Sequence, residues 1–350
     1  MGDNRGMPNC LRVGVVGCGA FGRNHARVYR DLAADATQTV EFVGIADTDH
    51  DRARAVAKEF DTHAFRSTDE LIAAGVNAVS VAVPTIAHLS VARQLMQSGV
   101  DVLIEKPLAT TVAEADELIA IAEGNGRIAQ TGHLERFNPA VRTTIPLITQ
   151  PMFFEVHRLS VFTPRSLDID VVLDLMIHDL DVVLSFVDSP IKEVRAVGLP
   201  ILSPKVDIAN VRMEFDSGCV ANFTASRVST ERIRKLRFFQ PHQYVSVDYS
   251  RQDVLVISID ELTPDPAGLD PFNPASVAAS AFPGITPHKP KVEEQEPLRA
   301  ELSSFLRAVR ERSAPEVTLH DGRRALAAAM QIVQAIAEHS RHARLSELSR

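Results

Sequence analysis

The stretch VGVVGCGAFG, residues 13–22, sets a run of β-branched residues directly before glycines in GxGxxG spacing. In such a loop the first glycine permits the tight turn, the second lets the backbone approach a pyrophosphate, and the third lets a helix lie close to the strand. The amino end of that helix offers unpaired N–H groups to the anion. An ordinary glycine-rich turn is the alternative. The loop residues that we expect beside a dinucleotide are Gly17, Gly19, Ala20, Phe21 and Gly22.

Short hydrophobic runs alternate with helix-like segments around this loop, up to about residue 150. The runs include EFVGIAD at residues 41–47, NAVSVAVP at residues 77–84 and DVLIEKP at residues 101–107. Nearly continuous apolar strands are typical of a parallel sheet with helices on both faces. The pattern therefore predicts an α/β fold whose amino-terminal part, residues 1–150, is a Rossmann dinucleotide-binding domain.

The rhythm changes after Pro151, where strand-like runs follow one another. Examples are IANVRMEF at residues 208–215 and DVLVISI at residues 253–259. Such runs predict an open-faced, largely antiparallel sheet, with one face packed on a helix and the other facing water or a partner subunit. We expect a second, α+β domain over residues 151–350 for substrate binding and oligomerisation. It includes a Pro-rich arm at residues 260–297 and two terminal helices.

Composition narrows the class of protein further. The 350 residues predict two domains, at about 100–200 residues each. We find no apolar run near the ~20 residues of a membrane helix and no secretory signal, which predicts a cytoplasmic protein without a membrane partner. The net charge of −8 gives no reason to expect nucleic acid. Cys10, Cys18 and Cys219 are an odd count without CxxC spacing, so we expect neither a disulfide framework nor a metal site.

An acidic residue ends the second predicted strand. Asp47 could accept hydrogen bonds from the ribose hydroxyls of a dinucleotide and would repel the extra phosphate of NADP, so we expect NAD. The alternative is a helix cap, since Asp47 and Asp49 both precede a predicted helix. Arg52 and Arg54 are close enough in the sequence to weaken the repulsion of NADP.

Glu105, Lys106 and Pro107 end another predicted strand, at the carboxyl edge where ligands of such sheets bind. The Lys106 ammonium could donate to a substrate hydroxyl and stabilise a developing alkoxide. We expect Glu105 and Lys106 to lie beside the cofactor as well. A surface lysine before a turn is the alternative. The sequence leaves open whether the peptide bond before Pro107 is cis.

The apolar stretch VLDLMIHDLDVV, residues 172–183, carries Asp174, His178 and Asp181 at helical spacing, so that all three share one face. Asp174 could hold one imidazole nitrogen of His178, leaving the other to take a proton from an alcohol. The alternatives are a satisfied buried pair, an Asp174 that serves the helix amino end, and a metal site. A metal is disfavoured because no second His or Cys cluster accompanies the pair, and a neighbouring dinucleotide domain favours catalysis.

Together, GCGAFG, the EKP tripeptide and the DxxxH pair of Asp174 and His178 resemble the glucose-fructose oxidoreductase, inositol dehydrogenase and rhizopine catabolism (Gfo/Idh/MocA) oxidoreductase family. The resemblance covers essentially the whole chain. It implies hydride transfer at a sugar or cyclitol carbon, and a homodimer or homotetramer formed through the open sheet. It also implies that Lys106 and His178 are catalytic, with Asp174 as the polar neighbour of the acid/base.

Two stretches are similar to one branch of this family, namely GHLERFNPAV at residues 132–141 and DVVLDLMIHDLDVV at residues 170–183. That branch oxidises the C3 hydroxyl of UDP-N-acetylglucosamine with NAD. The similarity implies a 3-keto product for a partner aminotransferase, in lipid A or surface polysaccharide synthesis. Each arginine near the substrate could instead be solvated surface. The residues expected at the substrate, where arginine suits phosphate, are Arg136, Asn138, Arg158, Arg165, Asp174 and His178.

Two other functions stay open. One is an NAD-dependent dehydrogenase of a free cyclitol or hexose, built on the same fold. The other is a nonenzymatic cofactor-binding regulator. The presence of Lys106, Asp174 and His178 together speaks against a regulator, because a binding module does not need all three.

Overall fold

The computed structural model describes residues 10–163, 169–259 and 285–343. They fall into two compact units. The first comprises Met1–Phe137 and Gln295–Ala328, and the second comprises Asn138–Glu294 and Ala329–Arg350, within those described ranges. Arg165 and residues 260–284 of the expected Pro-rich arm lie outside the described residues.

The sheet of the first unit has six parallel strands in the order β3-β2-β1-β4-β5-β6. The strands are β1 (Leu11–Val16), β2 (Val40–Ala46), β3 (His63–Phe65), β4 (Ala78–Val81), β5 (Asp101–Glu105) and β6 (Ala129–Gly132). The strand order reverses beside β1, and ligands of such sheets bind outside the carboxyl ends at that reversal. The predicted Rossmann fold is confirmed.

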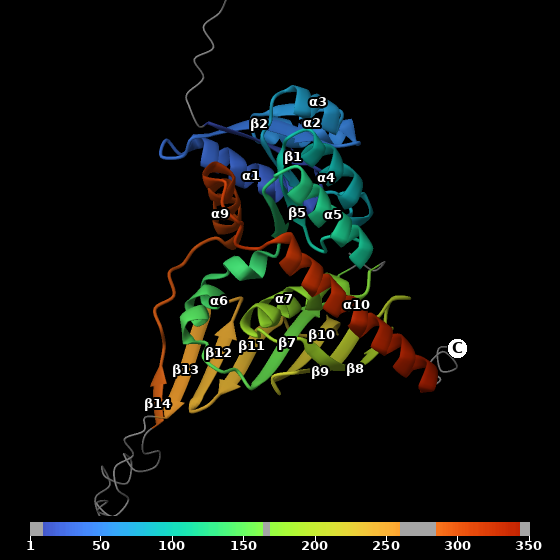
Figure 1. Ribbon diagram of the computed structural model, residues 1–350, viewed down its shortest axis with the longest axis vertical. Coiled ribbons are helices and arrows are strands. Elements are labelled where there is room, and N and C mark those ends of the chain that lie inside the picture. Colours follow the sequence, from blue (N-terminus) through green and yellow to red (C-terminus); the bar gives the residue numbers. More distant parts are fainter. Residues whose placement is uncertain (1–9, 164–168, 260–284, 344–350) are drawn as a thin grey trace, which may run out of the picture. The chain divides into compact units, whose positions relative to one another are not determined.

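Helices flank this parallel sheet, and α1 packs with α9 while α4 packs with α5 (Figure 1). Side-chain caps begin three of them, because the side chains of Asp49, Ser67 and Thr111 accept backbone N–H bonds at α2, α3 and α5. The helices are α1 (Ala20–Ala34), α2 (His50–Glu59), α3 (Thr68–Ala73), α4 (His88–Gln97), α5 (Val112–Gly124) and α9 (Pro297–Glu311), with short 3-10 turns η1 (Thr85–Ala87) and η2 (Leu134–Phe137). The long helix α10 (Leu319–His342) starts in this unit and ends in the other.

The division into units differs from the expected single boundary after residue 150. The first part ends at Phe137, and residues from Gln295 to Ala328 return to it. The reason is the apolar stripe of α9, which lies in one core cluster with Tyr29 and Leu32 of α1. Burying one such side chain contributes about 1.5–3 kcal/mol, so the stripe places the helix regardless of its position in the chain. The α9 residues in this core are Leu302, Phe305, Leu306 and Val309.

The second unit holds an eight-stranded sheet in the order β14-β13-β12-β11-β7-β10-β9-β8. Among the described strands of this second sheet, only β7 and β10 pair in parallel. The predicted, largely antiparallel sheet is therefore confirmed. The strands are β7 (Phe153–Val161), β8 (Ile191–Leu199), β9 (Ile208–Phe215), β10 (Val220–Ser229), β11 (Ile233–Gln240), β12 (Gln243–Asp248), β13 (Asp253–Ile259) and β14 (Ile285–His288). The helices and turns are α6 (Pro139–Thr144), η3 (Ile145–Leu147), the π-helix η4 (Val172–Met176) and α7 (Ile177–Phe186).

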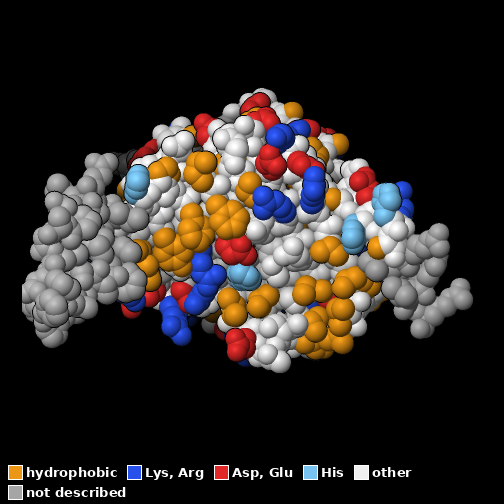
Figure 2. Space-filling view, turned by 90° about the horizontal axis from the view of Figure 1, so that it is seen from below, with side chains coloured by type: hydrophobic (Ala, Val, Ile, Leu, Met, Phe, Trp, Pro, Cys, Tyr) orange, Lys and Arg blue, Asp and Glu red, His pale blue; other side chains and the backbone are white. Residues whose placement is uncertain are grey.

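One face of this sheet is packed and the other is open. Phe186 of α7 lies 6.5 Å from Phe154 and 6.3 Å from Phe238, measured between ring centroids. The residues that alternate with these buried side chains, such as Phe153 and Phe239, point to the opposite face. Figure 2 views the molecule from below and shows several apolar patches, with acidic and basic side chains lying next to one another between them.

Membrane helices and metal sites were not expected from the sequence, and the described residues can be searched for both. None of the helices there is both long and apolar enough to cross a membrane. No group of three or more His, Cys, Asp or Glu side chains that could hold a metal ion occurs among the residues described above.

Candidate active site

A cavity of about 540 Å³ lies in the first unit, at the carboxyl ends of β1, β2, β3 and β4. Its lining includes four of the five expected loop residues, Gly17, Gly19, Ala20 and Phe21, together with Asp47. The sequence did not single out the other main contributors, which come from the segments after β3 and β4. The run NAVSVAVP could have indicated some of them. It forms β4, which lies next to β1, so its carboxyl end adjoins the glycine-rich loop. These residues are Arg66, Ser67, Thr68, Ala82, Val83 and Pro84.

The glycines of the loop are required by their surroundings. Gly17 has φ of 99°, and a Cβ there would lie 2.4 Å from the carbonyl oxygen of Ala82. A Cβ on Gly22 would lie 1.8 Å from the carbonyl oxygen of Gly17. A Cβ on Gly19 would meet nothing within 4 Å, so the backbone there is open to a ligand. The loop thus has the tight turn, the close helix and the open approach that a dinucleotide pyrophosphate requires.

Asp47 and Asp49 have different roles. The Asp47 carboxylate accepts hydrogen bonds from the N–H groups of Cys18, at 2.6 Å, and Asp49, at 2.8 Å. The side chain that caps α2 belongs to Asp49, which accepts from the Arg52 N–H at 3.1 Å. Asp47 is therefore not the cap of α2. It lies in the cavity lining beside the glycine-rich loop, where a ribose would lie.

The thiol of Cys18 is a protonated member of this loop. Burial and the neighbouring Asp47 carboxylate raise its pKa to about 12. The thiolate is the nucleophilic form of cysteine, so Cys18 is inert at neutral pH.

Glu105 is the last residue of β5 and Lys106 follows it, at the carboxyl edge as predicted, and the Lys106–Pro107 peptide bond is cis. The buried Glu105 carboxylate lies 2.9 Å from Nε2 of His25, which is fully buried in α1. Burial alone raises the pKa of Glu105, but its hydrogen bond with His25 and the charge of Lys106 together lower that pKa below its usual range. Glu105 is thus an anion next to the half-buried Lys106, and it supports the strand end that carries the lysine.

A second buried histidine, His88 of α4, links the ends of two strands. Its ring nitrogens lie 3.0 Å from the Val83 carbonyl oxygen and 3.1 Å from that of Pro107. Burial lowers the pKa of His88. The sequence did not single out His25 or His88, and the only signal was a polar residue on the apolar face of a predicted helix.

Asp174 and His178 belong to the second unit. Asp174 lies in the π-helix η4 and His178 in the first turn of α7, and both side chains are half-buried. The prediction of one regular helix over this stretch is wrong in detail, because the Ile177 N–H reaches back to the Val172 carbonyl over five residues. Short π-turns of this kind often occur at functional sites. The two side chains stay about one turn apart in either kind of helix.

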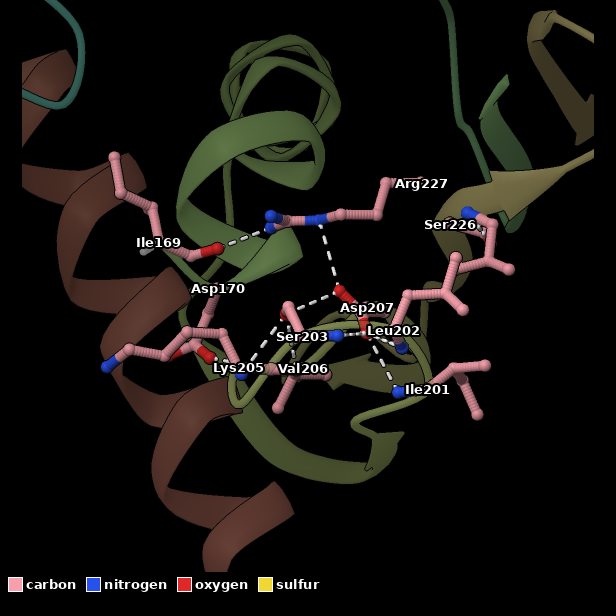
Figure 3. Close-up of polar contacts among 11 residues, drawn as sticks. Ile169, Asp170, Ile201, Leu202, Ser203, Lys205, Val206, Asp207, Ser226 and Arg227 are labelled. Atoms are coloured by element: carbon pink, nitrogen blue, oxygen red, sulfur yellow. Dashed lines mark hydrogen bonds and ion pairs between the residues drawn. The ribbon is translucent and has the colours of Figure 1, made fainter. Parts of the chain in front are cut away.

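A buried network holds the start of this π-helix (Figure 3). The Arg227 guanidinium donates to the Ile169 carbonyl oxygen and lies 3.7 Å from the Asp207 carboxylate. The Asp170 carboxylate accepts from the Val206 N–H at 3.0 Å, and the Asp170 carbonyl accepts from the Asp174 N–H at 3.0 Å. The chain is thereby fixed immediately before Asp174 and His178.

Asp207 is the anion of that network and is fully buried. Burial raises its pKa, but a larger set of hydrogen bonds lowers it below the usual range. The donors are the N–H groups of Ile201, Leu202 and Ser203 and the Ser203 hydroxyl, at 2.6–2.8 Å. The sequence did not point to Asp207 or Arg227, since neither lies near a motif.

Two residues expected at the substrate form hydrogen bonds within the second unit. The Arg158 guanidinium donates to both Asp179 carboxylate oxygens, at 2.6 and 2.9 Å, and the two side chains are 3% and 2% exposed. The Asn138 side chain accepts from the Ala140 N–H, capping α6, and donates to the Tyr249 carbonyl, both at 3.1 Å. This geometry favours a structural role for both residues. Arg136 lies in η2 of the first unit and is half-buried.

The parallel sheet, the glycine-rich loop and Asp47 place the chain among the dinucleotide-binding proteins. The chain belongs to the Gfo/Idh/MocA oxidoreductase family. The family model described as an oxidoreductase family with an NAD-binding Rossmann fold matches residues 11–133, and the model of the family's C-terminal domain matches residues 153–240. The predicted family and the NAD cofactor are confirmed, and the chain is an NAD-dependent dehydrogenase.

The similar proteins include several dehydrogenases. The UDP-N-acetylglucosamine 3-dehydrogenase of Acidithiobacillus ferrooxidans is 36% identical over 93% of this chain and 97% of that protein. Its solved structure superposes with a TM-score of 0.82. Inositol 2-dehydrogenase 1 of Saccharopolyspora erythraea is 33% identical over 53% of this chain and 56% of that protein. A levoglucosan dehydrogenase in complex with NADH and levoglucosan shares the fold, with a TM-score of 0.80 at 17% identity, over 94% of this chain and 97% of that one.

The role of Asp47 in cofactor choice can be measured. We expect Asp47→Ser to shift the ratio of kcat/KM for NADP against NAD toward NADP by about tenfold or more, because a carboxylate that repels the 2′-phosphate is removed. Arg66 and Arg52, whose guanidinium lies 3.0 Å from the Asp49 carboxylate, also line the cavity and would then attract that phosphate. Glu59→Ser is the control, since it removes a carboxylate from the same helix that pairs with Arg23 and does not line the cavity, and it should leave the ratio unchanged. An unchanged ratio in Asp47→Ser would remove Asp47 from cofactor selection.

Proposed function

We propose that this dehydrogenase oxidises the C3 hydroxyl of a UDP-sugar, with UDP-N-acetylglucosamine as the best candidate, to the 3-keto sugar. The observation that carries the proposal is the 36% identity to UDP-N-acetylglucosamine 3-dehydrogenase over nearly the full length of both chains. The geometry supports it in two ways. The first unit has a cavity fitted to a dinucleotide, and a lysine follows its fifth strand. In the second unit, His178 directly follows a π-helix whose start is fixed by a network of hydrogen bonds.

In the proposed reaction, His178 takes the proton of the C3 hydroxyl as the general base. Asp174, one turn before it, orients the imidazole and favours its charged form. The Lys106 ammonium donates to the reacting oxygen and stabilises the negative charge that develops there. Bound NAD supplies the hydride acceptor. Arg136 and Arg165 are the candidates for the diphosphate, because Arg158 is committed to Asp179.

A substrate panel tests the proposal. We expect NADH formation with UDP-N-acetylglucosamine and a 3-keto product. Turnover on free N-acetylglucosamine, glucose and myo-inositol should be low, since binding energy from the diphosphate also helps to orient the reacting carbon. Robust turnover of myo-inositol, together with no turnover of any UDP-sugar, would contradict the proposed activity. That result would favour the second candidate, a cyclitol or hexose dehydrogenase, which the similarity to inositol 2-dehydrogenase 1 over half of the chain supports. A protein that binds NAD and turns over none of these compounds would be a regulator.

The chemistry of the product suggests its context. A 3-keto sugar is the substrate that an aminotransferase needs, so we propose functional coupling to such an enzyme in lipid A or surface polysaccharide synthesis. Adding a glutamate-dependent aminotransferase should pull the unfavourable oxidation forward and increase the NADH formed. We place the enzyme in the cytoplasm, where NAD and nucleotide sugars are made.

The open sheet face is the proposed oligomer interface, of a homodimer or homotetramer. Phe153, Phe239 and Tyr244 form an aromatic ladder on it, with ring centroids 5.6 and 5.1 Å apart, and Phe239 is 38% exposed. Exposed apolar patches of this kind often mark protein interfaces. We expect Phe239→Glu to shift the sedimentation coefficient to that of a smaller species. Ile145→Glu, at an apolar residue of η3 that is 50% exposed, is the control. A monomeric wild-type protein would reject the interface.

A further inference from the structure

A second pocket, of about 460 Å³, lies in the second unit and is distinct from the dinucleotide cavity. Strands β7, β11 and β12 and the turns at their ends form it. Apart from Ile233, its lining is polar or charged. The lining residues are His157, Glu231, Arg232, Ile233, Arg234, Lys235, Arg237, Asp248, Ser250 and Arg251.

The pocket concentrates positive charge on an acidic protein. Five Arg or Lys residues and two carboxylate residues line it, an excess of three positive charges with His157 neutral, whereas the whole chain has a net charge of −8. Like charges held this close repel one another, so the cluster has a cost that an anion would remove. Such a site also attracts anions from solution.

The register of the strands places the charges in rows. Lys235 of β11 lies between His157 of β7 and Asp248 of β12, and Arg237 lies between Glu155 and Ser246. Lys235 and Arg237 alternate with the buried Leu236 and Phe238. They therefore project from the open face, on the side of the sheet opposite to α7, which carries His178.

Asp248 neutralises Lys235 and Arg251 only weakly. Asp248 Oδ1 accepts from the N–H groups of Ser250 and Arg251, both at 3.0 Å, which holds the turn. Its other oxygen lies 3.8 Å from the Lys235 ammonium and 4.0 Å from the Arg251 guanidinium, beyond hydrogen-bond distance. Neither Arg232 nor Arg237 forms a side-chain hydrogen bond or ion pair with any residue of the described ranges. The positive charge is thus available to a ligand.

From this arrangement we propose that the pocket on the open sheet face binds a small phosphate-bearing anion, with a diphosphate group as the unit that is recognised. Arginine guanidinium groups suit phosphate oxygens, and Lys235 adds a point charge. The volume exceeds that of a single phosphate and lies within the range of ligand sites. The lining has no Phe, Tyr or Trp on which a base could stack, so the site recognises the anion rather than a nucleobase. The pocket lies at the start of β11 and the end of β12, whereas Phe239 and Tyr244 of the proposed oligomer interface lie at the opposite ends of these strands. An oligomer formed through that aromatic ladder can therefore leave the pocket open.

The same face offers a matched control. Glu193, Arg195, Arg212 and Glu214 of β8 and β9 line a smaller pocket of about 150 Å³, in which two arginines are balanced by two glutamates. Removing Arg212 changes the charge of the protein as much as removing Arg237, but from a site without an excess of positive charge.

Titration calorimetry with inorganic pyrophosphate tests the proposal, with saturating NAD present to occupy the glycine-rich loop. We expect saturable binding to the wild-type protein that weakens with added salt and strengthens with tripolyphosphate. Lys235→Met and Arg237→Met should each weaken it by about tenfold or more. Arg212→Met should not change it. UDP and ADP should bind this site equally well, which separates recognition of the diphosphate from recognition of the base.

Three outcomes would overturn the proposal. The first is no saturable binding at low salt, and the second is a number of bound pyrophosphates per chain that is the same in the wild-type protein and in the Lys235→Met/Arg237→Met double variant. The third is an oligomer that dissociates in that double variant while the wild-type protein binds no pyrophosphate, which would make the basic cluster part of an interface between copies of the chain. Sedimentation of each variant separates this case from a lost anion site. Counting the bound pyrophosphates separates this pocket from the diphosphate site of the proposed substrate, because the double variant leaves that site intact.

Discussion

His178→Ala should lower turnover by about 10²- to 10⁴-fold and leave the affinity for NAD nearly unchanged. Loss of a general base has this range of effect, because the hydroxyl proton then has no acceptor of suitable pKa in the transition state. The affinity should persist because the dinucleotide cavity is lined by residues of the first unit alone. Steady-state turnover of UDP-N-acetylglucosamine and calorimetric titration of NAD measure the two quantities.

Two comparisons make this result specific. His339→Ala removes an exposed histidine of α10 and should leave turnover unchanged. His178→Gln keeps a hydrogen-bonding side chain of similar length without a basic nitrogen, and it should be as slow as His178→Ala. Wild-type turnover in either His178 variant would remove this residue from proton transfer and leave the Asp174–His178 pair a structural feature.

The architecture of the first unit followed from the sequence because parallel sheets have strong local signatures. Their strands are apolar on both faces, and the glycines after β1 are dictated by contacts that no other residue tolerates, as at Gly22. The return of α9 to this unit did not follow. An apolar stripe on a helix predicts that one side of the helix is buried, but it does not indicate against which surface.

The site was predictable to the extent that motifs mark strand ends and loops. Gly17, Asp47 and Lys106 lie where the sequence placed them, after β1, β2 and β5. The π-turn before His178 was not predictable, because it adds one residue to a turn without any change in residue pattern. Arg158 pairs with Asp179, 21 residues away, and Arg227 lies beside Asp207, 20 residues away. A single sequence carries no signal for pairings over such distances.

Arg158→Met should lower the free energy of unfolding by about 3–5 kcal/mol, the cost of leaving one partner of a buried ion pair without the other. Asp179 would keep a carboxylate that is 2% exposed, and the guanidinium that binds both of its oxygens would be gone. This is a large share of the roughly 5–15 kcal/mol that stabilises an ordinary domain. Urea denaturation measures it, and Arg195→Met, in an exposed pair with Glu193, should change the free energy of unfolding far less.

The same variant decides between two roles for Arg158. If the residue binds a substrate diphosphate, Arg158→Met should raise KM while the protein remains as stable as the wild type. If its role is to neutralise Asp179, then Asp179→Asn should be destabilising as well. The double variant Arg158→Met/Asp179→Leu should lose less stability than the two single losses together, because it leaves no unpaired buried charge. Equal and additive losses would show that the pair does not act as a unit. A stable Arg158→Met protein with a raised KM would restore Arg158 to the substrate site.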